Sequence, residues 1–314
     1  MLDRFFKKES PLLSMMGMGG GKGGFALKSA GGGAASASGG DVNGLEPGNG
    51  YKYHTFTSSG SLVVTADGPA EVLIVAGGGH GQTTSGHGAY AGGGAGGMVI
   101  DTGFELKAGT YTVVIGGENT DSSITHPEPQ QITAVQGGNS CTSAPSGFGG
   151  SGGGISVPGH GSPVTKPGAT GTQPFQSHVG GSPSLLQYGN PGGVGSTPGR
   201  YAASGGGGAG AVGGDNYPGH SSGRTGYGGN GVQLPAFTGP QIGVPSLAPH
   251  NGYFAGGGGG YDNSPFAGGV GGLGGGSPSQ PATMGSGHGA TNTGGGGARG
   301  GNGGSGIVVF RYAV

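Results

Sequence analysis

The chain has a single cysteine, Cys141, among its 314 residues, and it has no tryptophan. One cysteine cannot form an intramolecular disulfide framework, and it cannot supply a cysteine-rich zinc site. The sequence also lacks an apolar run of 18 residues, so we expect no segment to insert into a membrane. Its first nine residues have neither the apolar core nor the cleavage site of a secretory signal peptide, which predicts synthesis in a cytoplasm.

Charged side chains are scarce as well: 12 basic and 13 acidic residues give a net charge of −1. The basic residues are too sparse for a nucleic-acid-binding face. Asp215 and Asp262 are the only carboxylates between residues 136 and 306, and nothing in the sequence sets them at the separation that a glycosidase needs. The nine histidines lack the spacing and the further ligands of a metal site. We therefore expect no enzyme activity, no metal and no cofactor.

Glycine is abundant instead: 90 of 314 residues, gathered in runs such as 77–79, 205–208 and 256–260. Because glycine has no Cβ, glycine backbones can approach one another more closely than those of any other residue. Collagen needs glycine at every third position, and runs of four and five glycines break that register. Disordered soluble chains are usually highly charged, which this one is not. We therefore predict a folded chain in which backbone packs against backbone.

Residues 1–28 differ from the rest because they are basic, with five cationic and two anionic side chains, and carry two short apolar stretches. An apolar peptide without a domain around it needs a partner to cover it. We predict that residues 1–28 dock onto another protein; the alternatives are a frayed tail and a flap folded back on its own domain. Residues 29–50 are predicted to be a flexible linker. The side chains expected to make the docking contacts are Phe5, Phe6, Leu12, Leu13, Met15 and Met16.

Residues 51–135 have the pattern of β-strands. Short runs rich in β-branched and aromatic residues, among them 51–57, 71–76 and 110–115, alternate with turn residues, which is typical of an all-β unit. Residues 307–314 are one more apolar strand, and we expect them to pair back into the same sheet. These runs predict a small β-sandwich platform that the last residues of the chain close.

Residues 136–306 show no helical periodicity and are dominated by glycine. In the polyproline-II conformation each turn has three residues and no internal hydrogen bonds, so neighbouring segments must supply the partners. Ordering a residue costs about 1–2 kcal/mol, whereas a hydrogen bond returns a net of about 0.5–1.5 kcal/mol. Many adjacent segments on a β platform are therefore needed. The predicted fold class is all-β, with a polyglycine-II bundle of extended legs and recognition loops over residues 136–306.

Aromatic side chains at the turns between glycine runs are the candidates for recognition, because rigid rings with Asn and Ser neighbours bind at low entropic cost. Each one alone is more often a staple that holds its loop onto the bundle, but as a set we expect some to be exposed. The receptor-contact candidates are Phe175, His178, Tyr188, Tyr217, Phe237, Tyr253, Phe254, Tyr261 and Phe266. The inserts expected at an exposed tip are 172–190, 215–227, 232–254 and 261–266.

Six segments, spread in order over roughly residues 51–312, resemble the glycine-rich domain of bacteriophage tail-fibre and adhesin proteins, cyanophage ones included. Glu71-Val-Leu-Ile-Val-Ala-Gly-Gly-Gly79 is one of them. The others are Tyr53–Gly60, Ala108–Ile115, Tyr188–Gly193, Ala290–Gly296 and Gly303–Tyr312. The resemblance implies a layered bundle of polyglycine helices whose tip loops contact the host receptor. The chain departs from that pattern in having no long trimeric shaft before the domain.

The function expected from these observations is that of a virion protein, a short tail or capsid fibre that acts as a host-surface adhesin. Its expected partners are other virion proteins, through the N-terminal peptide, and a host surface glycan or outer-membrane protein; a homotrimer is one assembly that fits. The first alternative is a purely structural decoration protein of the capsid or tail. The second is a glycine-rich protein of a cell wall or matrix, which would need export.

Overall fold

The computed structural model describes residues 34–82, 89–142, 147–157, 165–173, 178–196, 202–216, 225–261, 268–279 and 287–314. All of them belong to one compact unit, Gly33–Val314. The predicted docking peptide and its six contact residues lie outside the described residues. In the described part of the chain, no helix is long and apolar enough to cross a membrane.

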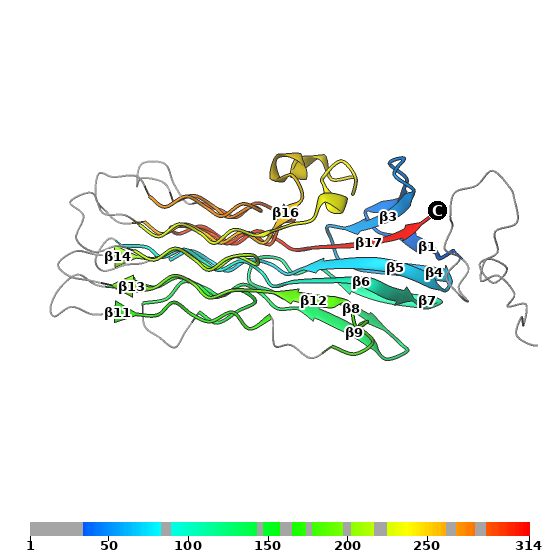
Figure 1. Ribbon diagram of the computed structural model, residues 1–314, viewed down its shortest axis with the longest axis horizontal. Coiled ribbons are helices and arrows are strands. Elements are labelled where there is room, and N and C mark those ends of the chain that lie inside the picture. Colours follow the sequence, from blue (N-terminus) through cyan, green and yellow to red (C-terminus); the bar gives the residue numbers. More distant parts are fainter. Residues whose placement is uncertain are drawn as a thin grey trace, which may run out of the picture. The chain divides into compact units, whose positions relative to one another are not determined.

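Two antiparallel sheets form the β platform (Figure 1). In the five-stranded sheet the order is β1-β4-β7-β8-β9, and in the six-stranded sheet it is β12-β6-β5-β17-β3-β2. The strands of the first sheet are β1 (Ser36–Gly39), β4 (Gly60–Ala66), β7 (Gly109–Val114), β8 (Ser122–His126) and β9 (Gln130–Ala134). Those of the second are β2 (Val42–Leu45), β3 (Tyr51–Phe56), β5 (Gly68–Val75), β6 (Met98–Leu106), β12 (Leu185–Tyr188) and β17 (Ile307–Ala313).

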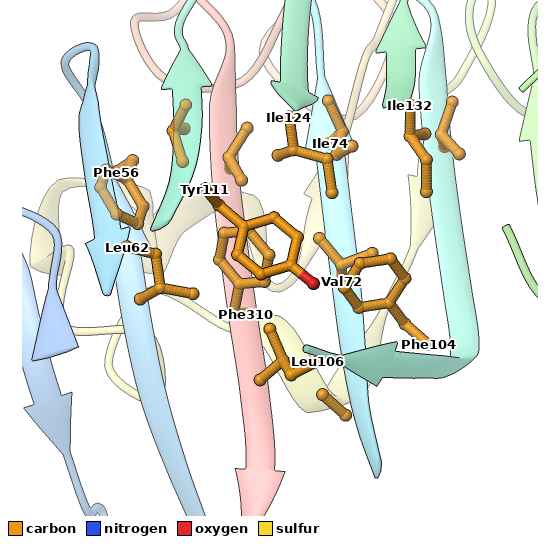
Figure 2. Close-up of a cluster of buried hydrophobic side chains, with 14 of the residues drawn as sticks. Phe56, Leu62, Val72, Ile74, Phe104, Leu106, Tyr111, Ile124, Ile132 and Phe310 are labelled. Carbon is orange, nitrogen blue, oxygen red and sulfur yellow. The ribbon is translucent and has the colours of Figure 1, made fainter. Parts of the chain in front are cut away.

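The facing sides of the two sheets enclose the first hydrophobic core (Figure 2). β4 shows the alternation that this requires: Leu62 and Val64 are buried, whereas Val63 between them is exposed. Across the core, Phe310 of β17 packs close to the rings of Phe56, Phe104 and Tyr111. β17 lies between β3 and β5, so the last strand of the chain completes the six-stranded sheet where the sequence predicted a closing strand.

The other face of the six-stranded sheet is covered by residues 232–254. Phe237, Ile242 and Leu247 of this segment are buried in a second core with Leu73 and Val309 of the sheet. Because both faces of the sheet are covered, β5 is buried without a break from Val72 to Val75, which explains its continuous apolar run. The segment contains β15 (Val232–Gln233), the 3₁₀ helices η3 (Pro235–Phe237) and η4 (Pro245–His250), and β16 (Tyr253–Phe254).

The prediction of a flexible linker over residues 29–50 is wrong for residues 34–50. β1 pairs with β4, and β2 pairs with β3. The Asp41 carboxylate, at the turn between β1 and β2, accepts hydrogen bonds from the backbone N–H groups of Thr57 and Ser58 at 2.7 and 2.9 Å. Small residues such as Ser and Gly carry little strand preference of their own, so hydrogen bonds to residues distant in the sequence determine this structure.

Glycine-rich extended segments, which we call legs, run side by side away from the sheets (Figure 1). Together they form the glycine bundle, which includes the two-residue strands β10 (Ser156–Val157), β11 (Thr165–Lys166), β13 (Gly195–Ser196) and β14 (Ala202–Ala203). The legs are residues 76–82, 89–97, 135–140, 147–154, 189–194, 204–208, 212–216, 225–231, 255–260, 268–272, 276–279, 294–298 and 301–306.

Hydrogen bonds between legs repeat every three residues. Gly93 and Gly96 donate to Gly297 and Gly294 of one neighbouring leg, both at 2.8 Å. The other donors of this leg follow the same repeat: Gly92 and Ala95 donate to Ser204 and Gly207, and Gly94 and Gly97 donate to Gly138 and Val135. The carbonyl groups of the leg accept from three further legs, through Gly79, Gly154 and Gly258.

A three-residue repeat with all hydrogen bonds directed to neighbours is the geometry of a polyproline-II-like helix, in which successive residues point in three directions. Apart from the short 3₁₀ helices η3 and η4, the described residues form mainly strands, extended legs and turns. The all-β class predicted from the sequence is therefore confirmed. The platform extends further along the chain than predicted, because it includes residues 36–45 and 185–188.

Gly206→Ala tests the requirement for glycine inside the bundle. A Cβ at residue 206 would overlap the carbonyl oxygen of Gly93 in the adjacent leg. We expect the substitution to lower the free energy of unfolding by roughly 1–3 kcal/mol or more, as overpacking of a filled interior does. Gly117→Ala is the matched control, since the nearest atom to its Cβ would lie 3.9 Å away. Equal thermal unfolding midpoints for the two variants would contradict close backbone packing.

Candidate functional site

The ends of the legs farthest from the sheets are linked to one another by hydrogen bonds. β10 pairs with β14, and β11 pairs with β13. Tyr90 and Tyr261 exchange backbone hydrogen bonds of 2.7 Å, and Gly300 donates to the carbonyl of Gln82 at 2.7 Å. The covalent chain continues from these leg ends into residues 83–88, 158–164, 197–201, 217–224 and 262–267. The attachment points of these connecting segments are therefore held at fixed positions.

Arg299 lies over two neighbouring tyrosine rings at this end, whose centres are 6.0 Å apart. Its guanidinium carbon is 5.0 Å from the ring centre of Tyr90 and 4.8 Å from that of Tyr261. The three residues lie at leg ends that are far apart in the sequence. A cation over an aromatic face is attracted by about 0.5–2 kcal/mol, depending on its exposure to water. The arrangement thus clamps three leg ends together, one of which leads into residues 262–267.

Polar side chains at the leg ends are engaged in binding backbone. The Asp215 carboxylate accepts the N–H of Val194 at 2.7 Å. The Asn216 side chain accepts from the N–H of Ser196 and donates to its carbonyl, both at 2.7 Å. Asp215 therefore fixes the neighbouring leg in place, and Asp262 lies outside the described residues. In the part of the chain that the structure describes, no group of three His, Cys, Asp or Glu side chains could hold a metal ion.

A groove of about 490 Å³ lies on the flank of the bundle. One wall is formed by residues 249–251 with Tyr253, at the end of η4 and the start of β16. Residues 272–278 line it as a tight turn between two legs, and His288 and Ala290 complete it. Its volume is in the range of sites for small ligands, which are concave and carry a few placed polar groups. We call this site the flank groove.

The turn that lines the flank groove depends on two glycines. Gly274 and Gly275 have φ values of +94° and +90°, which a residue with a Cβ rarely adopts. Their carbonyls accept hydrogen bonds from Gly256 at 3.0 Å and Ala290 at 2.8 Å, so the turn is tied to the legs on either side. Leu273, the residue before them, is 54% exposed although it is a large aliphatic side chain.

Two histidines line the flank groove in addition. Partial burial lowers the pKa of His250 below its ordinary value of 6.5, so its imidazole is neutral at pH 7. Nδ1 of His288 accepts the backbone N–H of Asn302 at 3.1 Å. This bond favours the tautomer of neutral His288 that carries its hydrogen on Nε2.

The sequence-predicted receptor contacts are distributed over several environments. Tyr253 lines the flank groove. Tyr261 contacts Arg299 at the leg ends and has only 4% of its surface exposed. Phe237 and Phe254 are each 1% exposed in the second core, so the prediction that they contact a receptor is wrong. Their rings hold residues 232–254 against the sheet, because burial of large aromatic rings is a main source of stabilisation for a segment whose strands and helices are this short.

Two further candidates lie beside the six-stranded sheet. Tyr188 belongs to β12, which pairs with β6, and it packs against the second core. His178 precedes the bridge between Val179 and Gln131, and burial lowers its pKa. The inserts 172–190 and 232–254 therefore do not form a tip in their described parts. The remaining candidates, Phe175, Tyr217 and Phe266, lie outside the described residues.

The sequence interpretation missed Tyr90, Arg299, Asn251, Leu273 and His288. Arg299 is one of only six charged residues between 136 and 306. Its isolation in the sequence could have marked it as a residue with a specific partner. A lone cation in an uncharged region needs a partner of its own, and Tyr90 and Tyr261 provide it. No local pattern could have paired residues 90, 261 and 299.

A family model of a glycine-rich domain matches residues 55–313, which include the whole bundle and both sheets except for β1, β2 and most of β3. No curated protein and no solved structure matches the chain.

Arg299→Gln tests the clamp at the leg ends. The change removes the charge and keeps a long polar side chain, so we expect the loss of roughly 1–2 kcal/mol of unfolding free energy. The amides of Tyr90 and Tyr261 should exchange their hydrogens faster, because their mutual bonds lose the arginine that covers them. Lys166→Gln is the control: this residue is also at a leg end, and among the described residues its ammonium donates one exposed hydrogen bond, to the carbonyl of Thr142. Unchanged exchange at Tyr90 in the Arg299 variant would show that the clamp does not hold the legs.

Proposed function

The chain belongs to the glycine-rich domain family, and from this membership and the geometry of the leg ends we propose that it is a bacteriophage virion protein that acts as a host-surface adhesin. In this proposal it is a short fibre of the tail or capsid, made in the host cytoplasm. Its glycine bundle holds connecting segments at fixed separations, and these segments contact a glycan or an outer-membrane protein of the host.

The observation that carries the proposal is the fixed spacing of the leg ends. Each leg is bonded to its neighbours every third residue, so a connecting segment can change in sequence without moving the attachment points of the others. Residues 217–224 and 262–267 contain Tyr, His, Arg, Asn and Phe side chains, the types that bind well from rigid supports. The likeness of the sequence motifs to phage tail-fibre and adhesin domains supports the assignment to a virion.

The competing proposal is a decoration protein, for which the bundle would be a stiff structural knob. It shares the scaffold and differs only in that the connecting segments have no ligand. Binding to a cell surface therefore decides between the two.

Whole-cell binding by the purified full chain tests the adhesin proposal. The labelled chain should bind saturably to some strains in a panel of Gram-negative bacteria and cyanobacteria. Tyr217→Ser and Phe266→Ser should weaken that binding about tenfold, as loss of an aromatic contact residue does. Leu186→Ser, an exposed position on β12, is the control and should bind like the native chain. If no strain binds the chain, or if the control loses binding equally, the adhesin proposal fails and the decoration protein takes its place.

We further propose that residues 1–28 attach the chain to another virion protein. Removal of these residues should leave the unfolding midpoint unchanged, because Gly33–Val314 is a compact unit by itself. We expect purified particles to contain the full-length chain and to lack the truncated chain when both are produced at the same level. Immunoblots of the particles measure this. Its incorporation at normal copy number would show that the attachment lies elsewhere.

A further inference from the structure

The flank groove suggests a second binding site that is separate from the leg ends. Its lining combines uncharged polar side chains, an aromatic ring and exposed aliphatic surface, and part of it is bare glycine backbone. We propose that the flank groove binds a neutral saccharide, in which every polar group is a hydroxyl, ether or amide and none is charged.

The absence of charge in the groove selects an uncharged ligand. Among the described residues that line it there is no Asp, Glu, Lys or Arg. A charged ligand group would lose its hydration on entering the groove and would find no partner of opposite charge there. Burying such a group costs free energy. The neutral imidazole of His250 has one donor and one acceptor nitrogen, which match a hydroxyl group that does both.

Apolar surface in the groove matches the C–H faces of a sugar ring. Tyr253 provides an aromatic ring with a polar tip, and Leu273, which lines the same groove, exposes more than half of its surface. Pro249 and Pro278 also line the groove and add rigid aliphatic surface. Such surface binds a carbohydrate face without a large loss of side-chain freedom, because proline and tyrosine have few rotatable bonds.

Hydrogen-bonding groups in the groove are left available for hydroxyls. The backbone N–H groups of Gly274 and Gly275 donate to no residue in the described part of the chain, although their carbonyls are engaged. His288 has its Nδ1 occupied by Asn302, so Nε2 is the nitrogen with a free hydrogen. Asn251 adopts φ +47°, a conformation that Asn and Gly tolerate, and contributes an amide. The groove thus offers both hydrogen-bond donors and hydrogen-bond acceptors.

Saturation-transfer NMR and calorimetry on the full chain test this inference with defined probes. The neutral probes are maltoheptaose, cellohexaose and mannotetraose; the acidic ones are a hyaluronan oligosaccharide and an oligosialic acid. We expect saturable binding of at least one neutral probe and none of the acidic ones. Asn251→Gly keeps the backbone conformation and removes the amide, and Leu273→Ser removes the apolar surface. Each should weaken binding about fivefold or more, as loss of one contact of about 1 kcal/mol does.

Val270→Ser is the matched control, because Val270 is 66% exposed on the leg that leads to the same turn but does not line the groove. It should bind like the native chain. The inference is overturned if no neutral probe binds, if only acidic probes bind, or if Val270→Ser loses binding as the groove variants do. These outcomes are independent of the adhesin proposal. Whole-cell binding through the connecting segments is tested separately, with Tyr217→Ser and Phe266→Ser. Absence of cell binding would leave the NMR result with the saccharide probes unaffected.

Discussion

Backbone hydrogen bonding between legs at every third residue is the interaction on which the glycine bundle depends. Inside the bundle it brings neighbouring legs so close that no side chain fits between them, as the overlap at Gly206 illustrates. The bonds are individually weak in net terms, and ordering a glycine costs at least as much as one bond returns. Stability must therefore come from many legs forming together and from a structure that holds them in register.

The β platform provides that register. β5 leads directly into leg 76–82, leg 89–97 leads into β6, and leg 301–306 leads into β17. These three strands are neighbours in the six-stranded sheet, and the bond from Ala76 to Gly97 continues the pairing of β5 with β6 into the bundle. Side-chain packing in two hydrophobic cores thus fixes where the legs begin, and the three-residue repeat carries that order to their far ends. Side chains therefore hold the sheets, and backbone bonds hold the legs. This explains how a chain with so few large side chains can form a defined structure.

The separation of scaffold and contact surface bears on function. Most legs are buried and nearly free of side chains. Beyond the sheets, the chemically diverse residues therefore gather at the leg ends, in the flank groove and in residues 232–254. Tyr90, Arg299 and Tyr261 show that some of the aromatic residues at turns are structural, since they hold the legs together. A protein of this design can vary its connecting segments while the fold is preserved, which is the property that an adhesin needs.

The candidate residues show where inference from sequence stopped. Alternation and apolar runs identified β3, β5, β7 and β17, because a strand's side-chain pattern is local. The same reasoning could not tell Phe237 and Phe254, which are core residues, from Tyr253, which lines a groove beside them. All three are aromatic residues at turns, and only the position of residues 232–254 over the six-stranded sheet separates them. Residues 34–50 were misjudged for a related reason, since their small side chains carry no strand pattern and their partners lie in β3 and β4.

The sequence by itself determined that this chain folds through backbone contacts, that it is all-β, and that charge-based chemistry is sparse along it, because glycine content, strand periodicity and charge are properties of the residues alone. Only the tertiary structure decided which legs are neighbours, which aromatic rings are buried, and that Arg299 meets two tyrosines. Those features depend on contacts between residues as far apart as 90 and 299, and a run of identical glycines carries no information about its partners.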